Sequence, residues 1–266
     1  MPHRILATYL IETAHPLEQA AAAMAGEQSS GTFIVLPGET DELRERFGAE
    51  VVRITPLDSV NGPSLPGSRP LKNGGEAHEF QRAEVVISFP FDNIGPSLPN
   101  LMTMVAGNLF ELGHFSGLRL TDIDLPQPFA DAYPGPQFGI DGTRQLTGVY
   151  DRPLIGTIIK PSVGLSPDET ADLVDTLTGA GLDFVKDDEL IAGPAYSTLA
   201  ARTQAVIPVI ERHAARTGRK LMYAFNITGD LDEMRRHHDT VLAAGGTCIM
   251  VSLNSVGLTG LIALRK

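Results

Sequence analysis

Cysteine is nearly absent from this chain: Cys248 is the only one among 266 residues. A single cysteine excludes a framework of internal disulfide bonds, which fits the reducing cytosol. Because Cys248 lies in an apolar segment, it is expected to be a small core residue rather than a nucleophile. We therefore expect a cytoplasmic protein that does not use a catalytic cysteine.

Long apolar runs are also missing. No segment approaches the ~18–20 apolar residues that a helix needs to span a bilayer. The first residues, Met-Pro-His-Arg, lack the apolar core and the cleavage site of a signal peptide. We therefore expect no membrane partner and no export.

Basic residues are outnumbered by acidic ones. The chain has 21 Lys and Arg against 32 Asp and Glu, which gives a formal net charge of -11. An acidic surface repels phosphate backbones, so nucleic acid is not expected as a partner. An anionic substrate would need a local cation, either a metal ion or lysines.

The first 150 residues have the pattern of an α+β domain. Strands are expected at residues 4–11, 33–36, 51–54, 83–89 and 118–123, and helices at residues 16–25, 39–47 and 98–109. Residues 61–78 are rich in Gly, Pro, Ser and Asn and predict an irregular loop, and residues 125–150 predict a turn-rich connector.

The second part, residues 151–266, alternates apolar strands with helical patterns, which predicts parallel βα units. Each strand ends in polar residues, and polar side chains at the carboxyl ends of several strands are typical of a (β/α)₈ barrel site. An open doubly wound sheet would also place a ligand there. No Gly-rich phosphate-binding motif follows the first of these strands, which favours the barrel.

The number of βα units is too small for a closed barrel. Only four strands fit after residue 152, whereas a barrel needs eight, and a half-barrel exposes two unpaired strand edges. We therefore expect an α/β protein with an N-terminal α+β domain at residues 1–150. The first half of a TIM barrel follows at residues 151–266, in a truncated chain.

Residues 183–189 (Asp-Phe-Val-Lys-Asp-Asp-Glu) carry the most specific chemical signal. Side chains alternate along a strand, so Lys186 and Asp188 point one way and Asp187 the other. Burying such charges is costly unless they pair or bind a metal, and carboxylates are the ligands that Mg²⁺ prefers. The alternative is a strand end that opens into a solvated acidic loop.

These motifs resemble the large subunit of RuBisCO, and more closely its type IV relatives, the RuBisCO-like proteins, which do not fix carbon dioxide. The similarity runs over nearly the whole chain. It is sharpest at residues 156–161 (Gly-Thr-Ile-Ile-Lys-Pro) and 181–189 (Gly-Leu-Asp-Phe-Val-Lys-Asp-Asp-Glu). The family implies a small ferredoxin-like α+β domain followed by an eight-stranded barrel. The last four strands of that barrel, with their phosphate-binding loops and mobile lid, are absent here.

The resemblance also implies a magnesium site. Lys186 matches a lysine that reacts with carbon dioxide to form a carbamate, and this carbamate would bind one Mg²⁺ together with Asp188 and Glu189. Lys160 matches the acid–base lysine of the family, whose charged form a metal and a partly dry site would disfavour. In the alternatives, Lys186 merely neutralises Asp187 or Asp188, and Lys160 is an exposed residue at a strand end.

Four further residues are implied as substrate-binding. Glu27, Thr32 and Asn108 match residues that reach the active site of the neighbouring subunit, so the resemblance implies a homodimer with shared sites. Asn226 matches a polar residue near the metal. Without the resemblance, Glu27 would be a loop charge, Asn108 a helix cap and Asn226 a turn residue.

One departure from the family pattern bears on the reaction. The carboxylases carry Lys-Pro-Lys where this chain has Lys160-Pro161-Ser162, so carboxylation of ribulose bisphosphate is not expected. The chemistry that remains is the Mg²⁺-stabilised formation of an enediolate from a phosphorylated keto sugar acid. Proton relocation, loss of carbon dioxide or transfer of the carboxylate can each follow from that intermediate.

The chain looks most like the RuBisCO-like branch that acts on branched sugar acids in carbohydrate catabolism. Its members decarboxylate 3-oxo-isoapionate 4-phosphate, or cleave it by transcarboxylation and hydrolysis, and this is the activity we expect. Two alternatives are a methionine-salvage enolase or isomerase of methylthio-sugar phosphates, and a non-catalytic scaffold or fragment. The presence of Lys160, Lys186, Asp188 and Glu189 argues against the scaffold, and the missing barrel half argues for it.

Overall fold

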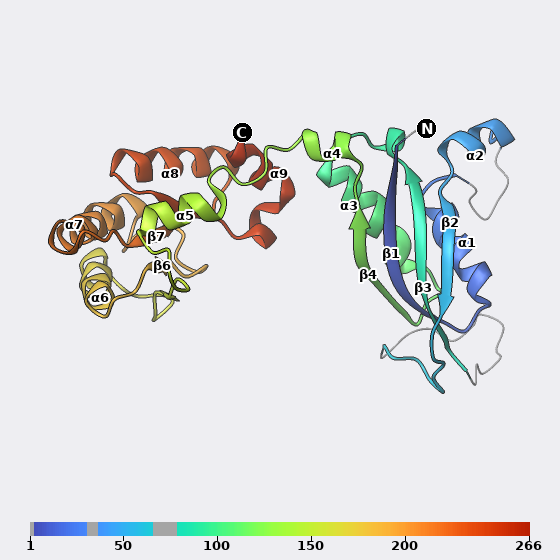
Figure 1. The fold of residues 1–266 in the computed structure, drawn as a ribbon, viewed down its shortest axis with the longest axis horizontal. Coiled ribbons are helices and arrows are strands. Elements are labelled where there is room, and N and C mark those ends of the chain that lie inside the picture. Colours follow the sequence, from blue (N-terminus) through green and yellow to red (C-terminus); the bar gives the residue numbers. More distant parts are fainter. Residues whose placement is uncertain (1–2, 31–36, 66–78) are drawn as a thin grey trace. The chain divides into compact units, whose positions relative to one another are not determined.

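The computed structural model describes residues 3–30, 37–65 and 79–266 (Figure 1). The chain divides into two compact units, Met1–Gly135 and Pro136–Lys266, each with its own hydrophobic core. The division falls before the boundary at residue 150 that the sequence suggested. No helix in the described part of the chain is long and apolar enough to cross a lipid bilayer.

The connector expected at residues 125–150 contains two helices rather than turns alone. They are α4 (Gln127–Asp131) and α5 (Gly139–Thr147). Glycines and prolines weaken the helical pattern here, which hides these helices from a reading of the sequence. Within the second unit, Arg144 fixes α5 to the segment that follows it by donating to the carbonyls of Val149 and Arg152, at 3.0 and 2.5 Å.

The first unit is an antiparallel sheet of order β2-β3-β1-β4. The sequence of its main elements, strand–helix–strand–strand–helix–strand, confirms the ferredoxin-like α+β domain. The elements are β1 (Arg4–Thr13), α1 (Leu17–Glu27), α2 (Asp41–Phe47), β2 (Glu50–Pro56), β3 (Gln81–Pro90), η1 (Phe91–Asn93), α3 (Leu98–Ala106), η2 (Asn108–Glu111) and β4 (Gly117–Asp124).

Alternation along β1 builds the core of this unit. Ile5, Ala7 and Tyr9 are buried and pack with side chains of α1 and α3, which cover that face of the sheet (Figure 1). The hydroxyl of Tyr9 donates to the carbonyl of Val105, at 2.6 Å, so this buried polar group is satisfied. The strand predicted at residues 33–36 lies outside the described residues.

The second unit is a parallel sheet of order β5-β6-β7-β8, as the first half of a TIM barrel requires. Its strands alternate with helices along the chain, as the sequence pattern of residues 151–266 predicted. The elements are β5 (Gly156–Ile158), α6 (Pro167–Gly179), β6 (Phe184–Lys186), α7 (Leu199–Thr217), β7 (Met222–Asn226), α8 (Leu231–Ala243), β8 (Cys248–Met250) and α9 (Leu253–Arg265).

The two faces of this sheet differ in what they carry. One face packs on the helices, where Val185 and Tyr223 join Val206 of α7 in the core. The other face carries Lys186, and here Ile158 is 37% exposed. This second face corresponds to the interior of the expected barrel.

Candidate active site

Polar side chains gather where the parallel strands of the second unit end. Lys160 lies two residues beyond β5, Asp188 lies two residues beyond β6, and Asn226 is the last residue of β7. Because neighbouring strands run in the same direction, their carboxyl ends meet at one edge of the sheet. The pairing of parallel strands therefore brings together residues that are far apart in the sequence.

Lys160, Ser162 and Asp188 form one connected group. The amine of Lys160 donates to Asp188 Oδ2, at 2.5 Å, and to Ser162 Oγ, at 2.7 Å. Ser162 Oγ in turn donates to Asp188 Oδ2, at 3.2 Å. The Lys160 amine holds the pKa of Asp188 below its usual value, and a backbone hydrogen bond from Leu190 adds to this effect.

Lys160 is less enclosed than the sequence suggested. Its side chain is 61% exposed, whereas that of Asp188 is 7% exposed. The partly dry surroundings expected for this lysine are therefore not provided by its neighbours in the described residues. Its partners, by contrast, are well defined, because the Lys160 amine contacts both a carboxylate and a hydroxyl.

Lys186 and Glu189 form a second pair at the end of β6. The amine of Lys186 lies 2.6 Å from Glu189 Oε1, and it also lies 3.5 Å from the sulfur of Met250 on β8. The Lys186 side chain is 19% exposed, and that of Glu189 is 52% exposed. Hydrogen bonding by Lys186 lowers the pKa of Glu189, so this carboxylate is held in its charged form.

The donor set fits a hard divalent ion only if Lys186 changes its chemistry. No three His, Cys, Asp or Glu side chains of residues 3–30, 37–65 and 79–266 come together as a metal site needs. Asp188 and Glu189 supply two oxygen ligands, and each now faces an ammonium group. A carbamate on Lys186 would replace one of these positive charges by a third anionic oxygen ligand, which suits Mg²⁺.

Asn226 supports the backbone of the same segment. Its side-chain nitrogen donates to the carbonyls of Asp188 and Glu189, at 3.2 and 3.1 Å. Asn226 is fully buried, and its side-chain oxygen accepts from the backbone nitrogen of Thr228, at 3.0 Å. In the described chain, the side chain of Asn226 therefore holds the loop that carries the two carboxylates.

Asp187 has partners that the sequence did not reveal. This fully buried carboxylate accepts from the hydroxyl of Tyr223, at 2.5 Å, and from Arg202, at 3.2 Å. A signal existed in the sequence, because Arg202 falls on the stripe of α7 that Leu199 and Val206 place in the core. An arginine on an apolar stripe needs a buried counter-charge.

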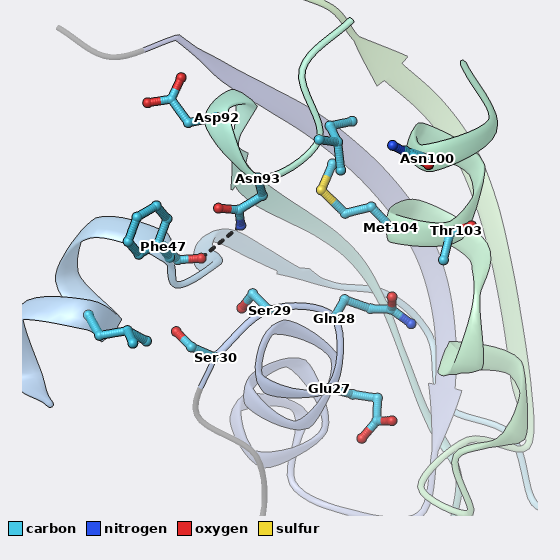
Figure 2. Close-up of a pocket in the computed structure, with 12 residues that line it drawn as sticks. Glu27, Gln28, Ser29, Ser30, Phe47, Asp92, Asn93, Asn100, Thr103 and Met104 are labelled. Carbon is cyan, nitrogen blue, oxygen red and sulfur yellow. Dashed lines mark hydrogen bonds between the residues drawn. The ribbon is translucent and has the colours of Figure 1, made fainter. Parts of the chain in front are cut away.

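One of the substrate-binding residues predicted in the first unit, Glu27, lines a cavity. Glu27 ends α1 and Asn108 begins η2, whereas Thr32 lies outside the described residues. Figure 2 shows Gln28 reaching from the end of α1 toward α3. The cavity is about 760 Å³ in volume and is lined by Glu27, Gln28, Ser29, Ser30, Leu43, Phe47, Asp92, Asn93, Ile94, Asn100, Thr103 and Met104.

Gln28, next to Glu27 in the chain, contacts the segment that begins with Asn108. One orientation of its amide satisfies all its hydrogen-bonding positions, with the nitrogen 3.1 and 3.0 Å from the carbonyls of Thr103 and Met104. In that orientation the amide oxygen lies 3.2 Å from the backbone nitrogen of Asn108. The end of α1, which carries Glu27, is thereby fixed to the start of η2.

Comparison with known proteins identifies the family of both units. Residues 2–129 match the ribulose bisphosphate carboxylase large chain, N-terminal domain. Residues 139–266 match the catalytic domain of the same large chain. The two matches together cover nearly the whole sequence.

Two similar proteins have names that describe a reaction. A 3-oxo-isoapionate-4-phosphate transcarboxylase/hydrolase from Xanthobacter autotrophicus is 54% identical over 266 residues, which cover 100% of this chain and 63% of that protein. A 3-oxo-isoapionate-4-phosphate decarboxylase from Rhizobium etli is 48% identical over 263 residues, which cover 98% of this chain and 62% of that protein. The chain thus spans less than two thirds of the length of these curated relatives.

A solved structure agrees with the sequence comparisons. The RuBisCO-like protein from Burkholderia fungorum matches with a TM-score of 0.89 at 45% identity, covering 98% of this chain and 61% of that one. The resemblance first inferred from residues 156–161 and 181–189 is therefore confirmed. On the strength of both domains, this chain belongs to the ribulose bisphosphate carboxylase large-chain family.

Proposed function

We propose that the protein is a RuBisCO-like lyase that decarboxylates 3-oxo-isoapionate 4-phosphate or transfers its carboxylate. The observation that carries this proposal is the group at the ends of β5 and β6, where Lys160 contacts Asp188 and Lys186 contacts Glu189. The names of the two similar proteins supply the substrate class. Ser162, in place of a second lysine, supports a reaction other than fixation of carbon dioxide.

The metal part of the proposal concerns three residues. Asp188, Glu189 and a carbamate on Lys186 would hold one Mg²⁺, which would supply Lewis-acid stabilisation of the negative charge that develops on the substrate oxygens. The position of Lys186 supports this role, because its amine already lies 2.6 Å from one of the two carboxylates. Asn226 keeps both carboxylates in place through their backbone carbonyls.

The acid–base part of the proposal concerns Lys160. In decarboxylation of a 3-oxo acid, the bond between the carboxylate carbon and its neighbour breaks, and the electron pair moves toward the ketone oxygen. The carbon that loses carbon dioxide must then receive a proton. Lys160 has an exposed, charged amine beside Asp188 and would deliver that proton, recovering it later from water.

Ser162 would position Lys160 for this step. Its hydroxyl contacts both the Lys160 amine and the Asp188 carboxylate, so it limits where the amine can lie. The substrate phosphate and side group would be bound elsewhere. Glu27, Thr32 and Asn108 are proposed to contribute from the neighbouring subunit of a cytoplasmic homodimer.

The test is an assay of the full product of the gene, with Mg²⁺ and bicarbonate present. We expect release of carbon dioxide from 3-oxo-isoapionate 4-phosphate and no incorporation of labelled carbon dioxide into ribulose bisphosphate. Lys220→Gln changes a lysine that pairs with Glu211 outside the site and is the matched control for Lys160→Gln. Turnover of a methylthio-sugar phosphate without release of carbon dioxide would overturn the proposal.

A further inference from the structure

Asp187 stands between two proposed metal ligands in the sequence but faces away from them. Alternation along the end of β6 directs Lys186 to one side of the sheet and Asp187 to the side that packs on the helices. The Asp187 carboxylate is fully buried and accepts three hydrogen bonds. The donors are Tyr223 Oη at 2.5 Å, the backbone nitrogen of Asn226 at 2.9 Å and Arg202 Nη2 at 3.2 Å.

Arg202 extends this contact along the whole segment between β6 and α7. Its Nη1 donates to the carbonyl of Ser197, at 2.5 Å, and its Nη2 lies 3.5 Å from the carbonyl of Ile191. One guanidinium therefore touches the segment near its start, in its middle and near its end. Arg202 is itself fully buried, so the planar donor group is held in a single arrangement.

Stabilisation of the fold does not by itself explain the buried ion pair of Arg202 and Asp187. Removing two opposite charges from water is costly, and a buried ion pair is often no more stabilising than apolar residues of the same volume. The other buried positions of α7 are largely apolar, including Leu199, Val206 and Ile210. A buried pair at Arg202 and Asp187 is better explained by the geometry that it enforces.

We propose that Arg202 and Tyr223 are positioning residues that act through Asp187 on the proposed metal ligands. By fixing the Asp187 carboxylate from the helix side, they fix the backbone on both sides of it. Lys186 and Asp188 are its direct neighbours, so their directions follow. This inference rests on the metal site of the proposed function.

Loss of the Tyr223 hydroxyl should weaken the binding of Mg²⁺. Residues that orient the ligands of a metal without touching it typically change affinity by about 10- to 100-fold when they are replaced. Tyr223→Phe removes only a hydroxyl, and the ring stays in its place beside Phe225, at a centroid distance of 4.5 Å. We therefore expect about a 10-fold loss of affinity for Mg²⁺ in the presence of bicarbonate.

A matched control exists in the other unit. Tyr9 is also fully buried, and its hydroxyl also donates to a single acceptor, the carbonyl of Val105 at 2.6 Å. Tyr9→Phe makes the same chemical change far from β6 in the sequence. A general loss of stability would therefore appear in both variants, whereas a loss of metal affinity should appear only in Tyr223→Phe.

The experiment is calorimetric titration of Mg²⁺ into the full product of the gene, with and without bicarbonate, at a temperature where circular dichroism shows each variant folded. The variants are Tyr223→Phe, Tyr9→Phe and Arg202→Lys. Arg202→Lys keeps a charge opposite Asp187 but cannot reach both loop carbonyls. We expect weaker binding in Tyr223→Phe and Arg202→Lys and unchanged binding in Tyr9→Phe.

Three results would overturn the inference. Equal Mg²⁺ affinity in wild type and Tyr223→Phe would remove the positioning role but leave the proposed metal site intact. Failure of both Tyr223→Phe and Arg202→Lys to fold would make the network a requirement for folding instead. Absence of Mg²⁺ binding in the wild type, with and without bicarbonate, would remove the metal site itself, and the positioning role with it.

Discussion

The amine of Lys160, beyond the end of β5, lies 2.5 Å from the carboxylate of Asp188, beyond the end of β6. This contact joins the proposed acid–base group to a proposed metal ligand. Asp188 therefore has a cationic partner before any metal is bound. One carboxylate oxygen thus serves both proposed roles, because Asp188 would hold the metal and already positions the Lys160 amine.

Replacing Lys160 should affect turnover more than substrate binding. We expect Lys160→Gln to lower kcat by about 100-fold or more, because general acid–base groups typically contribute about 10²- to 10⁴-fold. KM should change little. Steady-state measurement of carbon dioxide release checks this prediction, and an equal loss in the Lys220→Gln control would contradict it.

The hydroxyl of Ser162 should matter through the position of Lys160. Ser162→Ala removes the contact of 2.7 Å to the amine, and we expect kcat to fall by about 3- to 10-fold, the effect of one lost hydrogen bond. Ser162→Thr keeps a hydroxyl and should recover most of the activity. Comparison of kcat and KM for the two variants checks this. Equal activity of Ser162→Ala and the wild type would show that Lys160 needs no such support.

Mg²⁺ binding should require the amine of Lys186, because this amine is the group that is proposed to react with carbon dioxide. Lys186→Arg keeps a positive charge beside Glu189, but a guanidinium does not form a stable carbamate. We expect Mg²⁺ binding that is enhanced by bicarbonate in the wild type and not in Lys186→Arg, measured by calorimetry. Removal of the metal with a chelator should abolish turnover, and Mg²⁺ with bicarbonate should restore it. Bicarbonate-enhanced binding in Lys186→Arg would disprove the carbamate.

Acid should destabilise the first unit through Glu12. Burial opposes the charge of this carboxylate, but hydrogen bonds from Ser64, Ser116 and Arg82 outweigh burial and lower its pKa to about 2. A lowered pKa in the folded state stabilises the fold fully above the unfolded value of 4.5 and progressively less as the pH falls toward 2.

The measurement is the free energy of unfolding in urea between pH 6 and pH 2, a range that extends down to the pKa of Glu12 in the folded state. The wild type should lose up to about 3 kcal/mol more stability over this range than Glu12→Gln, which has no charge to lose. Glu45→Gln, at an exposed position of α2, is the matched control and should follow the wild type. Identical profiles for Glu12→Gln and the wild type would contradict the prediction.

The periodicity of the sequence predicted the order of elements and the two sides of β6. Val185 and Asp187 are fully buried toward the helices, and Lys186 faces the other side, as alternation required. Strand and helix patterns depend on neighbours close in sequence, which is why they could be read directly. Helix α5 was missed because glycines at 139 and 142 hide its pattern.

The choice of partners within the site could not be predicted in the same way. Asp188 pairs with Lys160, 28 residues away, whereas Glu189 pairs with Lys186. Which carboxylate meets which amine depends on the path of two loops and on their support by Asn226. Sequence spacing does not contain that information.

The thioether of Met250 makes the candidate site sensitive to oxidation. Its sulfur lies 3.5 Å from the Lys186 amine and is only a weak hydrogen-bond acceptor. Oxidation to the sulfoxide would put a strong, polar oxygen acceptor in its place. That oxygen would compete with Glu189 for the amine, so peroxide damage at one methionine would act directly on the lysine that is proposed to carry the carbamate.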